Sequence, residues 1–98
     1  IISRNAFQGA ANYGAYSAVK AALLRLSESM AAELKDRGIS VNCVAPGTMD
    51  TPQNREAMPN ADYSEWVTPA AVTDVILFCA SDAACTVSGA AIPAYGRS

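Results

Sequence analysis

The sequence predicts an α/β protein in which helices cover a parallel sheet, and three observations lead to this class. Short, mostly apolar segments that are typical of strands lie at residues 1–2, 39–45 and 89–95. Two longer segments, at residues 15–37 and 69–81, repeat apolar residues at helical spacing. The resulting order is strand, helix, strand, helix, strand, which is typical of parallel βαβ units. Three short strands are too few for a complete doubly wound sheet, so we expect half of such a fold, incomplete on its own.

Composition excludes several classes of partner. The chain has 98 residues, 51% hydrophobic and 16% charged, as expected for one globular domain spanning residues 1–98. Its net charge of −2 argues against nucleic acid or an anionic membrane as a partner, and no apolar run approaches the ~20 residues that span a bilayer. Without histidine or a CxxC pair, we expect no metal site. We interpret the three cysteines as reduced thiols of a cytoplasmic protein: Cys43, Cys79 and Cys85.

The first element is predicted to be the end of a buried strand at Ile1 and Ile2. Residues 3–14 are rich in Gly, Asn, Ser and Ala, which indicates a loop. The chain opens on two β-branched apolar residues without an initiating methionine. We therefore expect a fragment or a truncated gene product.

The second element is predicted to be an amphipathic helix over residues 15–37. Gly38 follows it and provides the left-handed residue at which helices commonly end. Lys35 and Arg37 lie in the last turn, where the helix dipole favours cations. Its apolar positions recur three or four apart and predict the face that packs on the sheet: Val19, Leu23, Leu26, Met30 and Leu34.

A strand over residues 39–45 follows, since "ISVNCVA" is short, β-branched and mostly apolar. A Pro-Gly pair at residues 46–47 ends it. Residues 48–67 form a long polar loop that contains several large apolar side chains. Such a loop could cover an apolar small-molecule pocket, with Met49, Met58, Tyr63 and Trp66 as its candidate covering residues.

The last helix and the last strand have clear signals. Thr68 and Pro69 are typical of a helix start, with threonine as the N-cap and proline at the first helical position. Residues 89–95 are predicted to form the final strand. Because Pro93 cannot donate a ladder hydrogen bond, we expect this strand to lie at a sheet edge or to contain a bulge.

The stretch "YGAYSAVK" contains the pair of residues most typical of catalysis. Tyr16 and Lys20 are four apart, so a helix places both on one face, roughly 6 Å apart along its axis. An ammonium group at this range favours the phenolate form of a tyrosine, which could then give and take a proton. Tyr13 has Ser17 at the equivalent spacing and therefore lacks such a partner.

Two further features strengthen the chemical interpretation of this pair. Ser3 directly follows the first strand, thirteen residues before Tyr16, where open α/β sheets bind ligands. The strand at residues 39–45 ends in "APGTMDT", in which proline and glycine allow close approach of a ligand and Thr51 can hydrogen-bond an amide.

These residues resemble the C-terminal half of a short-chain dehydrogenase/reductase. The resemblance rests on Ser3, on "YSAVK" at residues 16–20 and on "VNCVAPGTMDT" at residues 41–51, and it covers nearly the whole chain. The segment "SGAAIPAYG" at residues 88–96 resembles the last strand of that family. The resemblance implies the C-terminal half of a Rossmann-like doubly wound parallel sheet.

The resemblance also implies a role for each site residue. Tyr16 is expected to protonate a carbonyl oxygen or to deprotonate an alcohol. Lys20 is expected to favour the phenolate form of Tyr16 and to hold the nicotinamide ribose. Ser3 is expected to polarise the substrate oxygen. The cofactor would be NAD or NADP, the substrate a small carbonyl or alcohol, and the assembly a homodimer or homotetramer. Besides Tyr16 and Lys20, the residues expected to contact the cofactor are Pro46, Gly47, Met49 and Thr51.

A narrower resemblance concerns the loop "MDTPQNREAMPNADYSEW", which is similar to the dihydropteridine reductase branch of the same family. That branch lacks a serine at the position of Ser3, so an ordinary carbonyl reductase is the main expectation and a pteridine reductase a minor alternative. The chain also lacks the Gly-rich turn that binds the cofactor pyrophosphate, so we expect it to be inactive alone. The remaining alternative is a non-catalytic remnant that acts as a folded association module.

Overall fold

The computed structural model describes residues 1–98, with helices and strands alternating along most of the chain. Four short 3₁₀ turns, at Arg4–Ala6, Lys35–Arg37, Tyr63–Glu65 and Asp82–Ala84, separate some of these elements. None of the helices combines the length and apolarity that a membrane span requires. The helices and strands are α1 (Gly14–Leu34), β1 (Cys43–Pro46), α2 (Pro52–Ala57), α3 (Pro69–Cys79) and β2 (Ala91–Ala94).

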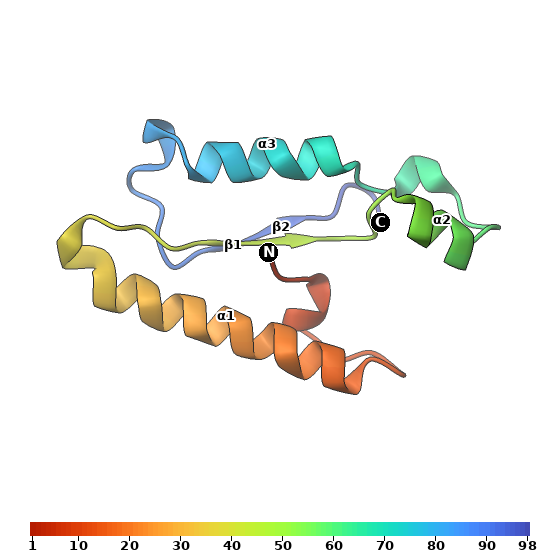
Figure 1. Cartoon of the computed structure of the whole chain (residues 1–98), viewed down its shortest axis with the longest axis horizontal. Coiled ribbons are helices and arrows are strands. Elements are labelled where there is room, and N and C mark those ends of the chain that lie inside the picture. The colour runs from red at the N-terminus through yellow and green to blue at the C-terminus, as the bar shows by residue number, and fades with distance from the viewer.

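The sheet lies between two helical layers. β1 and β2 pair in parallel, with Cys43 opposite Ala91, and α1 and α3 lie along opposite faces of the pair (Figure 1). At the other edge of β1, the Ile2 N–H donates to the Val44 carbonyl at 2.9 Å. The predicted strand at residues 1–2 is therefore wrong as an element: it makes one ladder bond before the chain turns at Arg4.

The core is split between the two faces of β1. All four β1 residues are buried, as expected for a parallel strand that helices cover on both faces. Cys43 and Ala45 pack with Leu24 of α1 on one face. Val44 packs with Val72 of α3 on the other. The period-2 alternation of a strand thus distributes β1 between two hydrophobic clusters.

Helix α1 confirms the predicted stop and corrects the predicted face. The helix ends at Leu34, continues as a 3₁₀ turn, and stops where Gly38 adopts φ 70°. Its buried residues are Ser17, Leu24 and Ala31. The predicted core face was wrong in its main members, because the sheet contacts the side of α1 that carries Ser17, Leu24 and Ala31. The main residues of the predicted face lie outside the core, each more than a third exposed: Val19, Leu23, Leu26 and Met30.

Other boundaries differ from expectation for identifiable reasons. Residues 39–42 are not a strand. The Asn42 side chain bonds the opposite segment at Val87 and Ala90, and a single backbone bond, from the Gly89 N–H to the Val41 carbonyl at 2.8 Å, accompanies it. The predicted loop at residues 48–67 contains α2, whose Thr-Pro start resembles that of α3. The edge position predicted from Pro93 is confirmed, since β2 pairs with β1 alone.

Candidate active site

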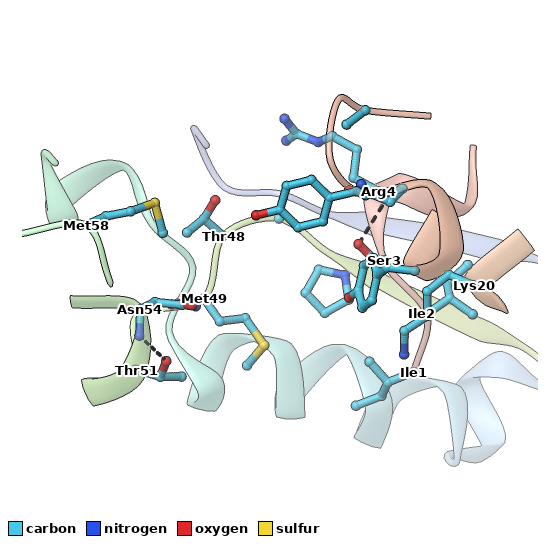
Figure 2. Close-up of a pocket in the computed structure, with 16 residues that line it drawn as sticks. Ile1, Ile2, Ser3, Arg4, Lys20, Thr48, Met49, Thr51, Asn54 and Met58 are labelled. Carbon is cyan, nitrogen blue, oxygen red and sulfur yellow. Dashed lines mark hydrogen bonds between the residues drawn. The ribbon is translucent and has the colours of Figure 1, made fainter. Parts of the chain in front are cut away.

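A cavity of about 540 Å³ lies where the carboxyl end of β1 faces the first turns of α1. Figure 2 shows Ser3 and Arg4 on one side of this cavity and Met58 on the other. Elements far apart in the sequence meet here because parallel strands carry their following loops to one edge of the sheet. Every residue predicted for catalysis or cofactor contact lines the cavity: Ser3, Tyr16, Lys20, Pro46, Gly47, Met49 and Thr51.

The helix side of the cavity presents the tyrosine and the lysine. Helix α1 begins at Gly14, so Tyr16 and Lys20 lie one turn apart near its start. The Lys20 ammonium is 5.6 Å from the centroid of the Tyr16 ring. The ring of Tyr13 meets that of Tyr16 edge-on, with centroids 6.1 Å apart. Tyr16 is 46% exposed, so its hydroxyl is accessible to a molecule in the cavity.

Ser3 is held so that its proton remains available. Its hydroxyl oxygen accepts the Asn5 backbone N–H at 3.2 Å and caps the first 3₁₀ turn. Because that bond uses a lone pair, the O–H can still donate to a substrate oxygen. The Asn5 side chain donates to the hydroxyl of buried Ser17 at 3.3 Å. This bond ties the serine loop to α1 one residue from Tyr16.

The loop side of the cavity offers two hydrogen-bond donors. The Thr51 hydroxyl accepts the Asn54 N–H at 3.2 Å as the N-cap of α2, which leaves its own proton free to donate (Figure 2). The Asn54 side chain donates to the Met49 carbonyl at 2.7 Å. The Met49 N–H donates to no atom of the chain. A planar amide in the cavity would thus meet an O–H and an N–H donor.

An ion pair supports the loop side from outside the cavity. The Arg55 guanidinium donates to both carboxylate oxygens of Asp50, at 2.5 and 2.8 Å. These hydrogen bonds hold the pKa of Asp50 below its ordinary value of 3.8. Arg55 also lies over the Tyr63 ring at 4.6 Å, and the Tyr63 and Trp66 rings pack at a tilt of 51° with centroids 4.7 Å apart. Of the four predicted covering residues, Met49 and Met58 line the cavity, whereas Tyr63 and Trp66 do not.

Gly47 lines the cavity, but its lack of a side chain has a second cause. A Cβ at this position would lie 3.0 Å from both the Cα and the carbonyl oxygen of Tyr95. Tyr95 therefore leaves no room for a side chain at Gly47, whether or not a ligand also approaches it. Four polar lining residues were not predicted from the sequence: Arg4, Asn5, Thr48 and Asn54. The first two adjoin Ser3 and could have been found by extending the serine motif.

Comparison with known proteins identifies relatives over nearly the whole chain. Residues 1–96 match the family described as enoyl-(acyl carrier protein) reductase. The chain is 34% identical to dehydrogenase/reductase SDR family member 6 of Aquarana catesbeiana, over 87% of this chain and 40% of that protein. It is 35% identical to 3-oxoacyl-(acyl-carrier-protein) reductase MabA of Mycobacterium bovis, over 90% of this chain and 39% of that protein. The chain thus spans about two fifths of these curated relatives.

Solved structures share the fold. Acetoin dehydrogenase from Enterobacter cloacae superposes with a TM-score of 0.84 and 28% identity, over 97% of this chain and 40% of that one. Angucycline C-6 ketoreductase LanV with bound NADP gives 0.81 and 32%, over 97% and 40%. 4-Hydroxyisoleucine dehydrogenase complexed with NADH gives 0.83 and 27%, over 97% and 42%. Each neighbour is a longer chain of which this one matches a part.

Proposed function

The chain belongs to the short-chain dehydrogenase/reductase family, and from this premise we propose that it forms the catalytic wall of an NAD- or NADP-dependent oxidoreductase. The proposed reaction interconverts a small carbonyl compound and its alcohol. One observation carries the proposal: all seven residues predicted for catalysis or cofactor contact converge on one cavity. Relatives named as dehydrogenases and reductases, two of them with NADH or NADP bound, support it.

The cavity fits the nicotinamide end of such a cofactor. The free Met49 N–H and the Thr51 O–H are suited to the carboxamide, and the Lys20 ammonium is suited to ribose hydroxyls. The residues of this chain do not fit the pyrophosphate, because no Gly-rich cluster is present. When bound, the nicotinamide supplies or accepts the hydride.

Tyr16 carries the proton in this proposal. It donates its phenolic proton to the substrate oxygen during reduction and removes the alcohol proton during oxidation. Lys20, on the same face of α1, stabilises the phenolate that remains after donation. Ser3 donates a hydrogen bond to the same substrate oxygen. Its hydroxyl oxygen accepts the Asn5 N–H with one lone pair, which leaves the O–H free to donate.

The test uses the product of the complete reading frame that contains residues 1–98, called the complete protein below. A panel of aliphatic ketones, 3-oxoacyl thioesters, a dihydropteridine and the corresponding alcohols is assayed with each cofactor. Tyr16→Phe is expected to lower kcat by about 10²–10⁴-fold, because it removes the acid–base hydroxyl, while cofactor affinity stays within about threefold. Tyr13→Phe is the matched control and should lower kcat by less than about tenfold, because no lysine accompanies it.

The outcomes of this panel separate the candidates. Turnover that survives in Tyr16→Phe would contradict the role of Tyr16. Selective reduction of the dihydropteridine would instead favour the pteridine reductase alternative.

A second candidate function is a non-catalytic association module. The apolar stripe of α1 favours it, since Val19 and Leu26 are 60% and 56% exposed and offer a surface for a second copy. The same stripe supports homodimer or homotetramer formation by an active enzyme. The two candidates differ in turnover: a complete protein that binds neither cofactor and reduces no carbonyl would favour the module.

A further inference from the structure

We propose that residues 95–98, called the C-terminal clasp below, position the cofactor-facing turn at residues 46–49, with Ser98 as the positioning residue. The inference rests on the proposed function, because it concerns how the turn is held for the nicotinamide. Figure 1 shows the C-terminus beside the carboxyl end of β1 and near α2, at the same edge of the sheet as the cavity.

The clasp holds one backbone amide of the turn, and the end of β2 holds the amide before it. The Thr48 N–H donates to the Ser98 hydroxyl oxygen at 3.0 Å, and that hydroxyl donates to the Tyr95 carbonyl at 2.7 Å. The Gly47 N–H donates to the Ala94 carbonyl at 3.1 Å, where β2 ends. Because Ser98 both accepts and donates, its hydroxyl is fixed in orientation. The end of β2 and the clasp therefore hold the turn in place through these hydrogen bonds.

Packing makes this attachment tight. A Cβ on Gly47 would lie 3.0 Å from Tyr95 backbone atoms and closer still to the Ser98 hydroxyl, so no side chain separates the turn from the clasp. A small displacement of the clasp must therefore be transmitted to the turn. The last residue of the turn is Met49, whose N–H is free. Two residues further along the chain lies Thr51, which lines the cavity.

The clasp also reaches two further segments, of which the serine loop lines the cavity and the turn at Tyr63–Glu65 does not. The Arg4 guanidinium, next to the catalytic serine, lies 4.0 Å over the Tyr95 ring and donates to the Ser98 carbonyl. On the opposite side, Arg97 donates to the Ser64 carbonyl at 3.3 Å. The loop that carries Ser3, the cofactor-facing turn and the 3₁₀ turn at Tyr63–Glu65 are thus all bonded to the clasp. Helix α1, which carries the proton-transfer pair, is not part of it.

This arrangement predicts a separation of effects. Removing the Ser98 hydroxyl frees the Thr48 amide and loosens the turn, which weakens binding at the nicotinamide end. Proton transfer by Tyr16 depends on α1 and is affected little. A residue of general structural importance would instead lower the amount of folded protein and would leave the affinity of the remaining active fraction unchanged.

The experiment compares three variants of the complete protein: Ser98→Ala, Ser98→Thr and Ser81→Ala. Ser81 is the matched control, because its hydroxyl donates to the Phe78 carbonyl at the end of α3, away from the cavity. Amide hydrogen exchange at Thr48 is measured by NMR without cofactor. Dissociation constants for NADH and NADPH are then measured by fluorescence titration, and kcat at saturating cofactor completes the set.

We expect Ser98→Ala to accelerate exchange at Thr48 by about tenfold and to weaken cofactor binding about five- to tenfold, as loss of one hydrogen bond implies. Its kcat should change less than about twofold, Ser98→Thr should restore both values, and Ser81→Ala should alter neither. Unchanged exchange at Thr48, or faster exchange with unchanged affinity, would overturn the inference. If the unsubstituted complete protein binds neither cofactor, the proposed function fails instead, and the exchange measurement still tests the contact.

Discussion

The two walls of the cavity are held by different interactions. The helix wall, formed by the first turns of α1, rests on a hydrophobic core in which Leu24 is only 4% exposed. The loop wall, residues 47–58, contains no fully buried residue. It is held by the Thr51 cap, the Asn54 side chain and the Asp50–Arg55 ion pair. Packing thus fixes the proposed proton-transfer pair, while polar contacts fix the proposed cofactor side.

The difference suggests that the helix wall serves as a rigid support and the loop wall as a part that can open. A packed helix is rigid, which suits a tyrosine that must meet a substrate oxygen in one geometry. A wall held by a few hydrogen bonds opens at lower free-energy cost, which suits a surface that admits and releases a cofactor. Substitutions that distinguish the walls therefore test this contrast.

The largest expected effect is on the stability of the helix wall. Leu24→Ala should lower the free energy of unfolding by about 2–5 kcal/mol, because it leaves a cavity between α1 and β1. Leu77→Ala, in α3, is the matched control and should cost less than about 1 kcal/mol, since Leu77 is 61% exposed. Urea unfolding of the complete protein measures both values. Equal losses would show that the core contact of Leu24 does not hold this wall.

A smaller effect is expected from acid on the loop wall. The hydrogen bonds from Arg55 depress the pKa of Asp50, so the ion pair stabilises the fold above the ordinary value of 3.8 and loses this contribution as pH falls further. The ring of Trp66 packs against Tyr63, over which Arg55 lies. The indole N–H signal of Trp66 should therefore shift below pH 3.8.

Asp50→Asn is the control for this acid effect. The amide cannot titrate, so the variant should show the loosened Trp66 signal at neutral pH and no further change from this pair on acidification. An acid shift of the same size in Asp50→Asn would assign the effect to another group, such as Asp62, whose pKa is lowered by hydrogen bonds from Ser64.

The sequence predicted the two walls unequally. Gly38 and the Thr68-Pro69 start were correct, because capping depends on local residue types that the sequence displays. The six-residue helix α2 was missed although Thr51-Pro52 carries the same signal, because it is too short for apolar periodicity. The hydrogen bonds that hold the loop wall likewise follow no spacing rule.

Tertiary context explains the remaining differences. Periodicity in α1 identified an apolar stripe but could not identify which side meets the sheet, so Ser17 and Ala31 were not expected in the core. The role of Ser98 was not predictable, since the residue lies 50 positions from Thr48 in the sequence. The convergence of Ser3, Tyr16 and the Pro-Gly turn on one cavity was predictable, because they form a motif whose spacing is specific. Their catalytic and cofactor-binding roles stay predictions.

The most direct test of the proposed function is a crystal structure of the complete protein with NAD or NADP bound. We expect the nicotinamide ring to lie in the cavity, with its carboxamide within hydrogen-bonding distance of the Met49 N–H and the Thr51 hydroxyl. The ribose should meet Lys20, and the Tyr16 hydroxyl should face the reactive carbon of the ring. A nicotinamide bound outside this cavity, or one that leaves Tyr16 without access to that carbon, would contradict the central claim.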